Sequence, residues 1–162
     1  MARGPFNLSI RIDDRDEGMA DLLEDLVGDE FDAVDIGLLT DEDEQFIIIG
    51  AANEFGTRNG HIPERSFIRA GVDENESNIN AWADRLHNQI IDGRLTKAVA
   101  LAKMGEVIQR HIQRKITTLR HPINADSTIA KKGSSNPLID TGRLRASIRW
   151  VLANTSDGEA GI

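Results

Sequence analysis

The stretch Thr96–Leu119, TKAVALAKMGEVIQRHIQRKITTL, decides the fold. Its large apolar residues recur at steps of three and four: Leu101, Met104, Ile108, Ile112, Ile116 and Leu119. That spacing predicts an α-helix with one buried stripe. Such a helix is about 36 Å long at about 1.5 Å per residue, so other elements must pack along it. Gly105 lies inside the stripe, and either a close crossing by another backbone or simple tolerance of a glycine explains it.

A second helix is predicted over Asn75–Ile91, immediately before the long one. Ile79, Trp82, Leu86 and Ile90 keep the same helical spacing. Asp92-Gly93 ends this helix, and the hydroxyl of Thr96 can cap the next one. The short connection predicts that the two helices pack antiparallel.

The first half of the chain has a different pattern. Residues 6–12 alternate apolar and polar, which predicts a strand, and residues 16–27 carry an apolar helical stripe of Met19, Leu22, Leu23, Leu26 and Val27. Residues 34–39 and 45–50 are predicted to form a β-hairpin around the acidic turn 40–44. Residues 64–70 are predicted to form a short turn that carries Phe67 and Ile68 inward.

The last third begins with a long polar loop, Arg120–Leu138, with one helical turn predicted at Ser127–Lys131. Residues 144–152 are predicted to start as a helical turn and end as a strand, and residues 153–162 to form a loose tail. The predicted fold is α+β, with a small, mainly antiparallel sheet packed against two long antiparallel helices, plus a short N-terminal helix. Residues 1–162 are predicted to form one domain, made of an acidic segment (residues 1–45), a body (residues 46–152) and the tail.

Charge is distributed unevenly along the chain. The net charge is −8, but residues 1–45 hold 15 acidic and 3 basic side chains, which gives −12. Residues 94–149 hold 12 basic and 3 acidic side chains, which gives +9. We rank neutralisation within the fold or between copies above nucleic-acid binding, because the whole molecule is acidic. The aromatic content of 4% also disfavours base stacking.

No pattern in the sequence predicts catalysis or a cofactor. The chain has no cysteine, and its four histidines form neither H-x-x-x-H nor H-E-x-x-H. The acidic turn at 40–44 has the oxygen ligands that calcium prefers, but it lacks the EF-hand spacing, so a solvated loop is favoured. No run of about 18 apolar residues is present, and no signal peptide or membrane span is expected. We therefore expect a protein that is not an enzyme and that has no catalytic residue, no metal site and no cofactor.

Three stretches, taken in order, resemble a known family. They are 51–57 (AANEFGT), 62–69 (IPERSFIR) and 127–148 (STIAKKGSSNPLIDTGRLRASI). The pattern is similar to that of the neck and tail-completion proteins of tailed bacteriophages, also called virion morphogenesis proteins. The match in order and spacing covers residues 45–152, whereas the acidic first 45 residues and the short end after Trp150 depart from it.

The resemblance implies a structural virion protein at the head–tail junction, assembled in the host cytoplasm. It implies a hexameric or dodecameric ring of identical subunits between the connector or head-closure protein and the tail terminator or tail tube protein. Genomic DNA would pass through this ring without specific binding, and no membrane is involved. The family-like motifs supply the candidate interface residues, which are Glu54, Phe55, Gly56, Pro63, Arg65, Phe67, Lys131, Lys132, Pro137, Leu138, Asp140, Thr141, Gly142, Leu144 and Ser147.

An acidic channel wall repels DNA and lets it slide, whereas a basic wall holds it by its phosphates. We therefore expect the strongly acidic turn to face the channel, through Asp41, Glu42, Asp43 and Glu44. The alternative is that the acidic residues only keep the free subunit soluble before assembly. The alternative function is a nucleic-acid-binding module that uses the basic segment 94–149. A weaker alternative is a hydrolase with a carboxylate site.

Overall fold

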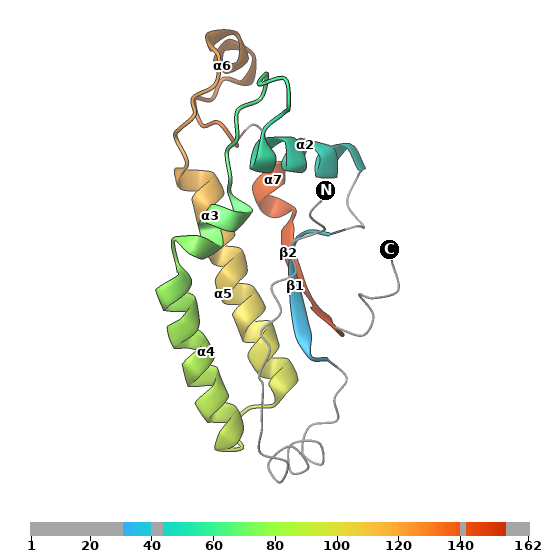
Figure 1. The fold of residues 1–162 in the computed structure, drawn as a ribbon, viewed down its shortest axis with the longest axis vertical. Helices are drawn as coiled ribbons and strands as arrows, with labels where there is room; N and C mark the ends of the chain where they lie inside the picture. Colours follow the sequence, from blue (N-terminus) through green and yellow to red (C-terminus); the bar gives the residue numbers. More distant parts are fainter. Residues whose placement is uncertain (1–30, 40–43, 140–141, 155–162) are drawn as a thin grey trace.

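The computed structural model describes residues 31–39, 44–139 and 142–154 (Figure 1). The predicted strand 6–12, the predicted helix 16–27 and the acidic residues 41–43 lie outside these ranges, as does the tail from residue 155. The described elements follow in this order: β1 (Ala33–Leu38), α2 (Glu44–Phe55), α3 (Ile68–Asp73), α4 (Glu76–Ile91), α5 (Lys97–Thr118), α6 (Asp126–Lys132), α7 (Arg143–Ala146) and β2 (Ile148–Ala153).

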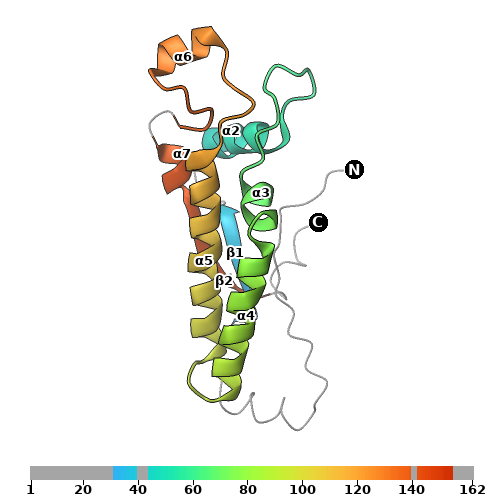
Figure 2. The same ribbon diagram turned by 90° about the vertical axis from the view of Figure 1, so that its left-hand side faces the viewer.

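Helix α5 is the axis of the molecule, and the predicted stripe is its buried side. Every predicted stripe residue is buried, from Leu101 to Leu119, and Ile108 and Ile112 are each only 1% exposed. Thr96 caps the helix as predicted, because its side chain accepts a hydrogen bond from the backbone N–H of Val99. Helices α3 and α4 pack on one side of α5 and the sheet packs on another (Figures 1 and 2).

Gly105 faces a side chain rather than a backbone. A Cβ atom at this position would lie 2.7 Å from Cγ and Cδ2 of Trp150, which is on β2. The indole ring therefore lies directly against the backbone of α5. The glycine is thus neither crossed by another backbone nor merely tolerated, because the close neighbour is the Trp150 ring.

The sheet has two antiparallel strands. Its register pairs Ala33 with Ala153, Ile36 with Trp150 and Leu38 with Ile148. The strand predicted at 34–39 is confirmed as β1, and the change from helical turn to strand after residue 144 is confirmed as α7 followed by β2. The fold is α+β, with the small antiparallel sheet packed on the helices.

The predicted strand at 45–50 and its hairpin with 34–39 are wrong. Residues 44–55 form helix α2, and β1 pairs with β2 instead. The continuous apolar run Phe46–Ile49 suggested a buried strand, but a short apolar run does not distinguish a strand from a helix by periodicity. The helix brings Phe46 and Gly50 to the same side, where they meet the body of the molecule.

Phe67 and Ile68 are carried inward as predicted, but residues 68–73 form helix α3 where only a turn was predicted. Phe67 is fully buried at the start of α3, Ile68 is half-buried, and α6 is the single helical segment in the long loop. Helices α4 and α5 lie side by side and run in opposite directions (Figure 2). Within the described ranges, none of the helices is long and apolar enough to cross a membrane.

Candidate interaction surface

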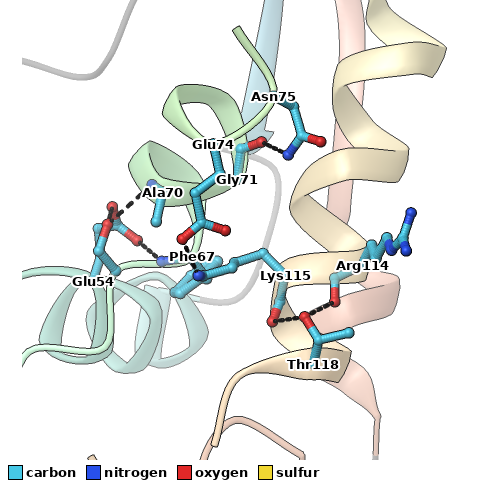
Figure 3. A network of polar contacts seen from close by, with 10 residues as sticks. Glu54, Phe67, Ala70, Gly71, Glu74, Asn75, Arg114, Lys115 and Thr118 are labelled. Atoms are coloured by element: carbon cyan, nitrogen blue, oxygen red, sulfur yellow. Dashed lines mark hydrogen bonds and ion pairs between the residues drawn. The ribbon is translucent and has the colours of Figure 1, made fainter. Parts of the chain in front are cut away.

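Glu54, near the end of α2, holds α2 against the start of α3. Its carboxylate accepts hydrogen bonds from the backbone N–H groups of Phe67, Ile68 and Arg69 at 2.7, 2.9 and 3.0 Å, and from the Ser66 hydroxyl at 2.8 Å. These are the N–H groups that a helix leaves unpaired at its start. A negative charge there is also favoured by the helix dipole. Glu54 is only 4% exposed, so this carboxylate of α2 forms a buried cap at the start of α3 (Figure 3).

Arg65 makes a second buried connection, between α2 and the segment that follows α5. Its Nε donates to the carbonyl of Pro122 at 2.9 Å, and its Nη2 donates to that of Ile123 at 3.1 Å. Its Nη1 donates to Oδ1 of Asn53 at 3.4 Å, and its backbone N–H donates to the carbonyl of the same residue at 2.7 Å. Burial lowers the pKa of the Arg65 guanidinium from its ordinary value. Arg65 and Glu54 together fix three segments that are distant in the sequence.

Gly56 permits the sharp turn that follows α2. It has φ +70°, and a Cβ atom there would lie 2.9 Å from the backbone nitrogen of Glu64. The loop beyond it closes through Thr57, whose N–H donates to the carbonyl of Ile62 at 2.9 Å and whose hydroxyl accepts from the N–H of Ile62 at 2.9 Å. The family-like residues from Asn53 to Phe67 therefore form one connected structure at the end of α2.

The outer face of α2, defined here as Ile48, Ile49, Ala51 and Phe55, is apolar and exposed. The exposed fractions are 59% for Ile48, 50% for Ile49 and 64% for Phe55, and Ala51 is also exposed. An exposed group of large apolar side chains marks a site of protein–protein contact more often than a lone exposed residue does. A helix that is apolar on all sides is normally covered on all sides.

The inner face of α2 packs closely against the end of β1 and the core. A Cβ atom at Gly50 would lie 2.1 Å from Cδ1 of Leu38, so this glycine brings the helix backbone close to the end of β1. Phe46 packs against the core, and the guanidinium of Arg143 lies 4.6 Å from the centre of its ring. The outer face is therefore presented by a helix that is fixed on its other side.

The segment 120–139, called the arm here, projects at the same end of the molecule as α2 (Figure 1). Its helix α6 contributes no buried residue. Asn136 ties the base of the arm to the body, because its side chain donates to the carbonyl of Thr117 at 2.9 Å and accepts from the N–H of Leu138 at 3.0 Å. Pro137 and Leu138 are buried, and Leu138 belongs to the core of the same subunit.

The other predicted interface residues have the following positions. Pro63 is half-buried and Lys131 is exposed, whereas Lys132 donates to the carbonyls of Asn136 and Pro137 at 3.3 Å. Gly142 precedes α7 with φ +79°, Leu144 is buried, and the Ser147 hydroxyl donates to the carbonyl of Arg143. Asp140 and Thr141 lie outside the described ranges, together with Asp41, Glu42 and Asp43, and Glu44 is the first residue of α2.

Six of the predicted interface residues are thus buried inside the subunit, namely Glu54, Arg65, Phe67, Pro137, Leu138 and Leu144. Glu54 and Arg65 connect α2 to the start of α3 and to the base of the arm. Sequence reasoning missed Ile48 and Ile49 as surface residues, although their presence in an unbroken apolar run was a signal. It also missed Asn53 and Asn136, whose roles depend on segments that meet only in the folded chain.

An open polar cleft of about 510 Å³ lies beside this end of α5, between Glu64, Arg65, Lys115, Arg120 and His121. Its charged groups join elements of the fold. Glu64 pairs with Arg69, Lys115 pairs with Glu74, and Arg120 donates to the carbonyls of Thr117 and Leu119. Across the ranges that the structure describes, no three His, Asp or Glu side chains gather in a way that would hold a metal ion.

Comparisons with protein-family models, with curated proteins and with solved structures found no match for this chain.

Proposed function

We propose that this chain is a structural subunit of the head–tail junction of a tailed bacteriophage, and that copies of it form a ring around the DNA channel. The observation that carries the proposal is the exposed outer face of α2, held rigidly by Glu54 and Arg65. These holding residues belong to the stretches 51–57 and 62–69 that carry the family resemblance. A ring of identical subunits needs an exposed, fixed surface that meets a different surface of the next copy.

The arm supports the same proposal. It extends from the body at the α2 end, it contributes few residues to the core, and its base is anchored by Asn136 and Leu138. A segment anchored at its base and exposed along α6 is suited to reach a neighbouring subunit. Phage neck assembly requires contacts of this kind with the same protein and with adjoining rings.

The main experiment compares two pairs of exposed apolar residues at opposite ends of the molecule. Purified protein is examined by light scattering and negative-stain electron microscopy, with Ile48→Asp plus Phe55→Asp against Ile91→Asp plus Val99→Asp. Ile91 and Val99 are 53% and 43% exposed, so they control for the loss of a surface apolar group. We expect closed rings from the unmodified chain and from the control, and smaller species from the α2 variant. Equal behaviour of the two variants, or no ring from the unmodified chain, contradicts the proposal.

A third variant tests the arm. Replacement of residues 127–133 by a Gly/Ser segment of equal length keeps Asn136 and Leu138, so the subunit should fold normally by circular dichroism and thermal melting. We expect this variant to form weaker or incomplete rings. Unimpaired assembly would remove the arm from the proposal.

The DNA-binding alternative makes a different prediction. A module that contacts several phosphates loses affinity steeply as salt rises. We expect weak binding of double-stranded DNA even at low salt, measured by fluorescence anisotropy. Tight, salt-sensitive binding would favour the basic segment 94–149 as a nucleic-acid surface. In the assembled ring we expect Asp41 to Glu44 near the bore, and their appearance on the outer wall would contradict the acidic channel.

A further inference from the structure

A second apolar surface lies between α4 and α5, at the end of the molecule opposite to α2. It is a groove of about 200 Å³. Its walls are largely apolar and include Leu86 and Ile90 from α4 with Leu101 and Met104 from α5, and the polar residues that line it are Asp84, His87 and Lys97. A groove between two packed helices is the shape that receives a ridge of side chains from a third helix.

The groove is level with the point where the described chain begins. Gln109 of α5 donates to the carbonyl of Ile148, and Gly105 lies against Trp150, so β2 runs antiparallel to α5. Strand β1 is antiparallel to β2 and therefore runs in the same direction as α5 (Figure 1). Ile36 pairs with Trp150, and Ala33 lies about 10 Å closer to the start of α5 at about 3.3 Å per residue. The start of α5, from Lys97 to Met104, forms the groove.

The sequence just before this point contains one suitable occupant. Met19, Leu22, Leu23 and Leu26 stand at positions i, i+3, i+4 and i+7, which is the pattern of a helix with one apolar face. Five residues, 28–32, separate that stretch from β1, and five residues span about 18 Å at most. This short connection is compatible with a position of residues 16–27 at the groove.

Charge favours the same pairing. Residues 1–45 carry −12 in a chain of −8, so residues 46–162 carry −8 − (−12) = +4. A helix with Met19, Leu22 and Leu26 in the groove would keep its acidic side chains out of the apolar groove. The positive charge of residues 46–162 would attract these acidic side chains.

We propose that residues 16–27 of this chain form a helix that docks its Met19–Leu26 ridge into the groove between α4 and α5 of the same subunit. The docking fills the groove and fixes the acidic N-terminal segment on the body. This inference does not depend on the ring, and a failure of either proposal leaves the other testable.

Cysteine cross-linking of the full chain tests the docking, because the natural sequence contains no cysteine. The test pair is Leu22→Cys with His87→Cys, and His87 lies at the edge of the groove. The control pair is Asp21→Cys with His87→Cys, which differs by one residue but turns its thiol by about 100° around the predicted helix, away from the apolar stripe. Under mild oxidation, non-reducing gels and peptide mass spectrometry then measure the rate and the sites of disulfide formation.

We expect the test pair to form an intramolecular disulfide at least about tenfold faster than the control, at a rate independent of protein concentration. Equal rates overturn the proposal. Cross-linked dimers whose yield rises with concentration also overturn it, because they assign the groove to the helix of a second copy.

Hydrogen exchange provides a second measurement that does not require disulfide geometry. Leu22→Ser plus Leu26→Ser should increase amide exchange about tenfold or more near Leu86 and Leu101, whereas Asp21→Ser plus Asp25→Ser should not, because only the first pair uncovers the groove. Circular dichroism checks that both variants remain folded. Unchanged exchange in the leucine variant, with no disulfide in the test pair, rejects the docking.

Discussion

Helices α5 and α2 are both rich in apolar residues, but the surrounding structure uses them in opposite ways. Helix α5 has apolar residues on one face and polar residues on the other, and its apolar stripe is covered by α3, α4 and the sheet. Helix α2 has an unbroken apolar run, and only one side of it is covered. This difference indicates that α5 stabilises the subunit. Helix α2 packs on the core with one side and exposes an apolar surface, available for a partner, on the other.

The sharpest test of this comparison uses the same substitution in both helices. Ile108 is 1% exposed, and Ile108→Ala should lower the free energy of unfolding by about 2–5 kcal/mol through lost burial and a residual cavity. Ile48 is 59% exposed, and Ile48→Ala should change it by less than about 0.5 kcal/mol while weakening self-association. Denaturant unfolding measures both. Similar losses would mean that α2 belongs to the core and is not a surface.

The second test concerns the buried cap that holds α2. Glu54→Gln replaces one acceptor oxygen by an amide donor that faces backbone N–H groups, and it removes the charge. We expect a loss of about 1.5–3 kcal/mol in the free energy of unfolding. Glu64→Gln is the matched control, because that carboxylate is exposed and pairs with Arg69, so a surface ion pair of at most about 1 kcal/mol is lost. Equal effects would show that the cap does not hold the helix.

The third test concerns the close approach on the α5 side. Gly105→Ala forces a Cβ atom into the Trp150 ring, which should cost about 1–3 kcal/mol despite the better helix propensity of alanine. With Trp150→Ala already present, the same change should instead stabilise the protein by up to about 1 kcal/mol. Thermal or chemical unfolding of the four proteins gives the coupling between the two sites. Additive effects would contradict the contact.

The smallest expected effect is a pH dependence at the α4–α5 contact. Burial, followed by the charges of Arg110 and Arg114, lowers the pKa of His111, whose Nε2 lies 3.2 Å from Oδ1 of Asn78. The unfolded chain then binds more protons than the folded chain in the window just below pH about 6.5, so stability falls as the pH decreases through that window. Solvent screening limits the change to under about 1 kcal/mol.

His111→Gln should flatten the dependence of unfolding free energy on pH in this window, as followed by denaturant titrations at several pH values. An unchanged slope would assign the dependence to other groups.

The sequence by itself determined the elements whose pattern is periodic. The spacing from Leu101 to Leu119 specified α5 and its buried side, the spacing from Ile79 to Ile90 specified α4, and the change of pattern after residue 144 specified α7 and β2. These predictions succeeded because the period of apolar residues is a local property that survives in any compact fold.

Only the tertiary structure decided the conformation of residues 44–55 and the roles of the residues around them. Phe46–Ile49 is compatible with a strand or a helix, and the choice followed from packing of Gly50 against Leu38 and from the cap that Glu54 gives to α3. Most partners of the Glu54 and Arg65 side chains are backbone groups 13 to 58 positions away in the sequence. No local pattern encodes such partners, because backbone N–H and C=O groups are the same at almost every residue and become specific only when the chain brings them together.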